Sequence, residues 1–143
     1  MGGVFQGRPG VIVGPHRNIR SCQHRRPGGG VLANQARQVV DRYLRLRSTN
    51  AGTAWAWPEG VLPILTWGCG MYACVDCRSD NGTVLLFEPN PGDPDQAWYV
   101  DSDSLEEWFE HHVNDTGWWS KAENGEEPEN LQPWTDARTR ASR

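Results

Sequence analysis

The chain has 143 residues, the size of one domain, and 37% of them are hydrophobic, so we expect one modest core. Eight tryptophans enlarge that core, because each aromatic ring buries roughly 150–250 Å². The sequence contains no run of about 20 apolar residues, which excludes a membrane-spanning helix, and it begins without the apolar segment of a signal peptide. We therefore expect a cytoplasmic protein whose cysteines are reduced.

The net charge of −4 is divided sharply along the chain. Residues 1–50 carry nine arginines and one aspartate, a net charge of +8, whereas residues 51–143 carry a net charge of −12. An acidic surface repels nucleic acid and attracts basic proteins. The charge pattern therefore disfavours nucleic acid as a partner and favours a basic protein.

Residues 1–30 are rich in glycine, arginine and proline and show little periodicity. This composition predicts an irregular basic leader. The alternative is a basic arm that contacts nucleic acid or an acidic surface, for which the candidates are Arg8, Arg17, Arg20, Arg25 and Arg26. The leader has no aromatic interleaving beyond Phe5, so stacking on bases is poorly supported.

A helix is predicted over residues 31–47, VLANQARQVVDRYLRLR. The apolar residues recur at helical spacing: Leu32, Ala36, Val39, Tyr43 and Leu46, with Val40 and Leu44 widening the stripe. The opposite, arginine-rich side is interpreted as a solvated face. Residues 48–52 contain the polar residues and glycine that end a helix.

Four strands are predicted in the middle of the chain, at residues 61–67, 71–78, 83–87 and 97–100. Asn81-Gly82 predicts a tight hairpin between the second and third strands, because both central residues of such a turn need positive φ. The proline-rich residues 88–96 form a loop, and residues 97–100 are expected at an edge of the sheet.

A second helix is predicted to begin after Ser104, because Ser104 and Glu107 match a capping box. Its apolar face consists of Leu105, Trp108, Phe109 and His112, and its wet face of Glu106, Glu107 and Glu110. Trp118 and Trp119 are expected to fold back on the core. Residues 120–143 are interpreted as a disordered polar tail, with Trp134 as the one exception to its composition.

Three cysteines, Cys69, Cys74 and Cys77, are spaced in a way that invites a zinc or redox site. On a strand, however, side chains alternate between faces, so Cys74 and Cys77 point to opposite sides. We favour core cysteines without a bound metal, and a small zinc- or thiol-dependent enzyme stays as the alternative. The chain has no G-x-S-x-G motif and no nucleotide fingerprint, so neither catalytic residues nor a cofactor are predicted.

Three segments, WPEGVLPILTWGCGMYACVDC, VLLFEPN and SLEEWFEHHV with Trp118-Trp119 after it, resemble the C-terminal half of a domain of the SUKH superfamily. The superfamily includes Smi/Knr-type regulators of cell-wall assembly and many bacterial immunity proteins. The resemblance covers residues 31–119 and leaves 1–30 as leader and 120–143 as tail. It implies an α+β fold, a small twisted antiparallel sheet with flanking helices, and protein binding without catalysis. Bacterial members neutralise polymorphic toxins, often nucleases, by direct contact.

This resemblance makes the acidic residues after the third strand the candidate partner-binding surface, facing a basic protein such as a polymorphic toxin. The candidates are Asp93, Asp95, Asp101, Asp103, Glu106, Glu107 and Glu110, with Trp98, if exposed, as an aromatic anchor among them. The alternative is that these acids only keep the domain soluble.

Overall fold

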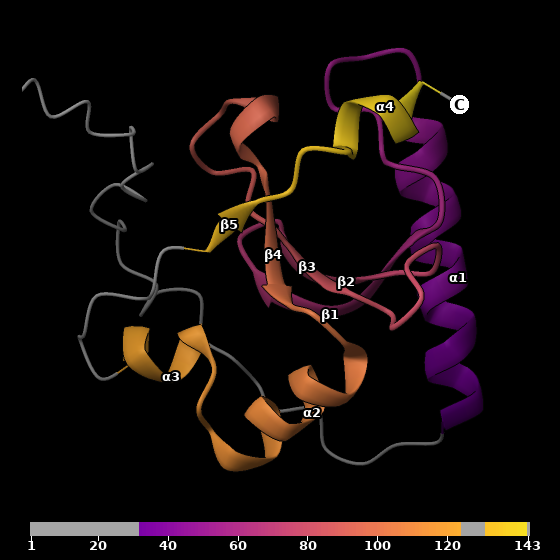
Figure 1. The fold of residues 1–143 in the computed structure, drawn as a ribbon. Helices are drawn as coiled ribbons and strands as arrows, with labels where there is room; N and C mark the ends of the chain where they lie inside the picture. Colours follow the sequence, from indigo (N-terminus) through magenta and orange to yellow (C-terminus); the bar gives the residue numbers. More distant parts are fainter. Residues whose placement is uncertain (1–31, 124–130, 143) are drawn as a thin grey trace, which may run out of the picture.

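The computed structural model describes residues 32–123 and 131–142 (Figure 1). The elements in chain order are α1 (Leu32–Thr49), β1 (Val61–Gly68), β2 (Met71–Asp76), β3 (Val84–Phe87), the 3-10 helix η2 (Pro94–Gln96), β4 (Trp98–Ser102), α2 (Leu105–Asn114), α3 (Trp118–Glu123), β5 (Gln132–Pro133) and α4 (Ala137–Ala141). The predicted α+β class is confirmed. The predicted basic leader, residues 1–30, lies outside the described residues.

The sheet is an antiparallel meander in the order β1-β2-β3-β4-β5, so every strand pairs with its neighbour in sequence. Alternation along β2 sends Ala73 and Val75 to one face and Cys74 to the other. Each face therefore buries its own apolar cluster. α2 and α3 cover the cluster around Ala73, whereas α1 and α4 cover the cluster around Cys74.

Tyr43 and Leu46 of α1 pack on the second cluster, beside Trp57, which is 1% exposed. The Trp57 ring makes edge contacts with Phe87 and Trp98, with centroids 5.1 and 5.0 Å apart. Its indole N–H donates to the carbonyl of Val61 at 2.8 Å, so burial leaves no donor unsatisfied. The predicted helix is thus confirmed, and Tyr43 and Leu46 face the core as expected. The expected stripe is too wide, because Val40 and Leu44 are 49% and 57% exposed and Ala36 is exposed as well.

The two hairpins differ from the prediction in where the tight turn lies. Cys69 and Gly70 join β1 to β2 with φ of 50° and 80°, the left-handed pair that a two-residue hairpin requires. The predicted turn at Asn81-Gly82 lies instead in a wide loop, residues 77–83. The Ser79 hydroxyl orders that loop, because it donates to the Asp76 carbonyl at 2.9 Å and accepts from the Thr83 N–H at 2.6 Å.

The prediction of a disordered polar tail is wrong for residues 120–123, which belong to α3, and for residues 131–142, which we call the C-terminal strap. Its strand β5 pairs with β4, so β4 is not an edge strand as expected. Trp134 packs on Trp98 with ring centroids 5.7 Å apart, and its backbone N–H donates to the Trp98 carbonyl at 2.9 Å. Arg140 binds the buried carboxylate of Asp76 and lies over the Trp134 ring. Contacts of Trp134 and Arg140 therefore fix the position of the C-terminal strap, although its composition is polar.

No helix in the described ranges combines the length and the apolar character needed to cross a membrane.

Candidate functional site

The eight predicted site residues do not form one surface. Asp93 and Asp95 belong to the η2 region before β4, whereas Asp101 to Glu110 follow along the end of β4 and α2. η2 and α2 lie at opposite ends of β4 (Figure 1). The strand between them has five residues, or about 16 Å, so the two groups of acids are separate.

The acids at the η2 end are occupied within the chain. The Asp93 carboxylate accepts from the Asp95 backbone N–H and from Gln96 Nε2, both at 3.0 Å. The Asp95 carboxylate is paired with the Arg138 guanidinium of α4. Trp98, which was to serve as an anchor if exposed, is 6% exposed and packs against Phe87 with ring centroids 4.7 Å apart. Trp98 is therefore a core residue, and this end offers little free charge.

The acids next to β4 also have structural roles. Asp101 is half-buried, and its Oδ2 accepts from Trp118 Nε1 at 3.2 Å. Burial raises the pKa of Asp101, and the hydrogen bond from Trp118 lowers it in part. The Asp101 carboxylate thus anchors α3 to the sheet, away from solvent.

The predicted N-cap at the start of α2 is confirmed, but the Glu107 carboxylate reaches the N–H of Asp103, one residue before the N-cap, and not that of Ser104. Ser104 Oγ accepts from the Glu107 N–H at 3.1 Å, and Glu107 Oε2 reaches back to accept from the Asp103 N–H at 2.8 Å. The Glu107 carboxylate is therefore engaged in holding the helix start. The Asp103 side chain is exposed beside it.

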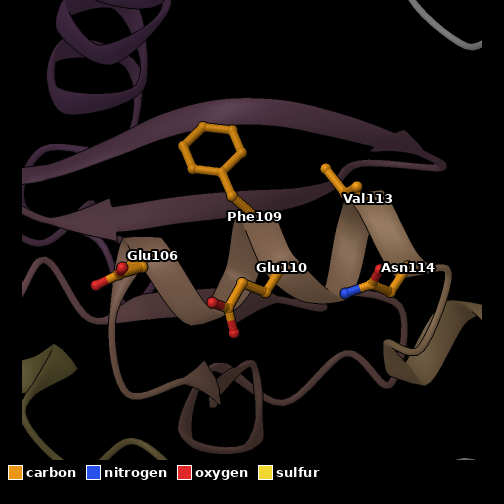
Figure 2. A pocket seen from close by; sticks show the side chains of 5 residues that line it. All are labelled: Glu106, Phe109, Glu110, Val113 and Asn114. Carbon is orange, nitrogen blue, oxygen red and sulfur yellow. The ribbon is translucent and has the colours of Figure 1, made fainter.

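The solvent side of α2 carries the remaining acids beside two exposed apolar side chains. We call this surface the α2 face, and it consists of Glu106, Phe109, Glu110, Val113 and Asn114, which line a shallow open hollow of about 380 Å³ (Figure 2). Phe109 is 52% exposed and Val113 is 82% exposed. The two apolar side chains point to the same side of the helix (Figure 2).

The prediction that Phe109 faces the core is wrong. Trp108, 3% exposed, takes the buried position and contacts Trp119 with ring centroids 6.3 Å apart. His112 stacks on Trp108 at 5.1 Å and stays on the exposed rim. Phe109 follows Trp108 and therefore points about 100° further around the helix. The contact between Trp108 and α3 occupies the buried side, so Phe109 faces solvent. Val113 was missed in the sequence, although its spacing of four residues from Phe109 is the signal for a second apolar face.

Glu106 and Glu110 are unpaired on this surface. Neither makes an ion pair with any residue of the described ranges. Carboxylates one turn apart on a helix destabilise it by roughly 0.2–0.5 kcal/mol. Two free carboxylates beside exposed Phe109 and Val113 give a surface with an acidic strip next to an apolar one, which suits a partner with cations beside an apolar patch.

The cysteines do not assemble into a site. Cys69 is exposed in the β1–β2 turn and is disulfide-bonded, so the prediction of reduced cysteines is wrong for it. Cys74 and Cys77 are free. Cys74 is fully buried, whereas Cys77 is exposed. Cys69 precedes β2 and Cys77 follows it, and this strand of six residues is about 20 Å long.

Burial raises the pKa of the Cys74 thiol, and burial together with the Asp76 carboxylate raises the pKa of Cys77. A raised pKa keeps a thiol protonated and poorly nucleophilic. Among residues 32–123 and 131–142, no three His, Cys, Asp or Glu side chains are grouped so that they could hold a metal ion. The geometry therefore gives no support to the zinc or thiol alternative built on these three cysteines.

Comparison with protein-family models identifies the family of the chain. The model of the SMI1/KNR4 family (SUKH-1) matches residues 18–111, about two thirds of the chain. The chain therefore belongs to this family, and the resemblance seen in the sequence is confirmed. Members of the family are in general non-catalytic proteins of the immunity or regulator type. Searches of the curated proteins and of the solved structures gave no match.

Proposed function

We propose that this chain is a non-enzymatic immunity-type protein that binds and neutralises a basic toxin, such as a nuclease domain, through the α2 face. The family supports a binding module of this general type. The observation that carries the proposal is the pair of free carboxylates, Glu106 and Glu110, beside exposed Phe109 and Val113. The other acids named from the sequence have partners in the fold or lie apart from this apolar centre.

On the α2 face, the acidic and the apolar side chains contribute to binding in different ways. A nuclease is basic where it holds phosphate, so Glu106 and Glu110 steer the encounter and pair with its cations. Phe109 supplies an aromatic anchor, and Val113 extends the contact by one helical turn. Binding at this face would cover the phosphate-binding surface of the toxin, which blocks its substrate without any reaction on this chain.

The test first asks whether a neighbouring reading frame encodes a toxin, whose C-terminal domain then serves as the probe; neighbouring frames without a toxin would count against the proposal. The wild-type chain should protect cells that express this domain and bind it in calorimetry. The double variant Glu106→Lys with Glu110→Lys should lose at least tenfold in affinity and fail to protect. Phe109→Ser should also lose at least tenfold, because central aromatic anchors contribute about 2 kcal/mol or more.

The matched control is the double variant Asp41→Lys with Asp95→Lys, which changes the net charge equally but leaves the α2 face intact. Asp41 is exposed on α1, and Asp95 lies at the η2 end of β4. We expect this control to stay within about threefold of wild type. An equal loss in both double variants would mean that only net charge matters and would contradict a role for the α2 face.

A further inference from the structure

The exposed large hydrophobic residues of the described ranges fall on two helices. They are Val40 and Leu44 on α1, 49% and 57% exposed, and Phe109 and Val113 on α2. Each pair is separated by four residues, so each forms an apolar ridge along one side of its helix. Val40 and Leu44 were expected in the buried stripe of α1 but are exposed, so neither ridge is covered by the described part of the chain.

The two ridges carry opposite charge. α1 contains four arginines and one aspartate, whereas α2 contains three glutamates and no lysine or arginine. Arg37 and Arg45 are exposed around Val40 and Leu44, with Asp41 as the single acid, and these residues together form what we call the α1 face. The α1 face thus combines an apolar ridge with basic side chains, the complement of the α2 face, which combines an apolar ridge with acidic ones.

The two faces cannot meet within one chain. α1 packs on the cluster that contains Trp57 and Cys74, and α2 packs on the cluster on the other side of the sheet, which contains Ala73 and Trp108. The solvent sides of the two helices therefore lie on opposite sides of the sheet. Any contact between the α1 face and the α2 face must join two copies.

We propose that the α1 face of one copy docks on the α2 face of another copy. Ridges with a spacing of four residues interdigitate in the commonest mode of helix packing, so Val40 and Leu44 fit beside Phe109 and Val113. In that arrangement Arg37 and Arg45 face the carboxylates of Glu106 and Glu110. The contact is heterologous, because each copy offers a different surface to each neighbour, and it does not close into a two-fold dimer.

Docking of one copy on another would affect the proposed toxin binding, although the docking does not depend on the proposed function. A pair of helix faces buries less area than the 1,200–2,000 Å² of a stable interface, so the association is weak and concentration-dependent. The toxin and the second copy would compete for the same α2 face. Self-association would then shield the exposed Phe109 and Val113 until a tighter partner displaces it.

The test uses sedimentation velocity of the full chain from about 10 µM to about 1 mM, a range suited to weak association. The wild type should form species larger than the monomer as the concentration rises. Leu44→Asp blocks the α1 face and Val113→Asp blocks the α2 face, so each variant alone should be monomeric. An equimolar mixture should form a 1:1 dimer and nothing larger, because one intact α1 face and one intact α2 face remain.

Gln38→Asp is the control, because Gln38 is exposed on α1 but lies away from the ridge. This variant should associate like the wild type. Arg45→Glu and Glu110→Arg provide a second pair, each weakened alone and restored by mixing, if either aspartate variant fails to fold.

Three results would overturn the proposal: a wild type that stays monomeric throughout, a single-face variant that still dimerises, or a mixture that does not. Leu44→Asp separates the two proposals, since it should keep full toxin binding. Retained toxin binding without self-association of the wild type would remove this inference alone.

Discussion

Arg140 shows how one residue far along the chain can fix a fold. Its guanidinium, with a side chain 17% exposed, binds the Asp76 carboxylate, which is 4% exposed at the end of β2. The Arg140 carbonyl also accepts from the Glu59 N–H at 3.2 Å. A buried carboxylate without its cation is costly, so the C-terminal strap and the centre of the sheet depend on each other.

Replacement of Arg140 by alanine should lower the free energy of unfolding by about 3–5 kcal/mol, because Asp76 keeps only the Arg78 N–H as a donor. Urea denaturation measures this loss. Arg138→Ala is the control, since Arg138 and Asp95 form an exposed pair, with side chains 73% and 51% exposed, whose loss should cost less than about 1 kcal/mol. Similar losses in the two variants would contradict a structural role for the buried pair.

Asp101 should give the stability of the domain a specific dependence on pH. Burial raises its pKa in the folded chain, so the folded state binds the proton more strongly than the unfolded state. Stability from this group is therefore greatest below the ordinary carboxyl pKa and falls as pH rises through the raised pKa. Asp101→Asn removes the titration and keeps an oxygen for the Trp118 N–H. We expect a flatter unfolding profile across mildly acidic pH, and superimposable profiles would show that Asp101 is not the source.

At the scale of elements, the end of α2 depends on Gly117 for space. The helix ends at Asn114, and its C-cap residue Asp115 takes the left-handed conformation with φ of 54°. A Cβ on Gly117 would lie 2.2 Å from the Trp119 ring. Gly117 therefore allows Trp119 to enter the core.

Gly117→Ala should destabilise the chain by about 1–3 kcal/mol, because Trp119 or the backbone must move to admit the methyl group. Gly92→Ala is the comparison, since it has open space but φ of 80°, and strain alone should cost about 1 kcal/mol. Chemical denaturation followed by tryptophan fluorescence compares the two. A smaller effect at Gly117 than at Gly92 would contradict the packing role.

The elements that could be predicted from the sequence are those fixed by local patterns. The N-cap at Ser104 needs only residues within one helical turn, and the hairpin strands show alternation, although the tight turn expected at Asn81-Gly82 lies at Cys69-Gly70. The C-terminal strap could not be predicted, because its order depends on Trp98 and Asp76, which are far away in sequence. The exposed position of Phe109 was missed for the same reason, since Trp119 decides which side of α2 is buried.

At the scale of the whole molecule, the sequence identified where acid residues are plentiful but not which of them are free. Asp95 is paired with Arg138, which is 43 residues later in the chain, and no local pattern reveals that pairing. The fold leaves Glu106 and Glu110 without a cation in the described part of the chain and exposes Phe109 between them. The basic and acidic helices, α1 and α2, then lie on opposite faces of the sheet.

The measurement that tests the proposed role of the α2 face most directly is the affinity of the toxin domain for the full chain at about 50 mM and about 300 mM salt. The wild type should lose at least tenfold in affinity between these conditions, because the charges of Glu106 and Glu110 are exposed and screened by salt. The double variant Glu106→Lys with Glu110→Lys should bind weakly at both and lose most of the salt dependence. Tight binding that is independent of salt and unchanged in the double variant would contradict the account.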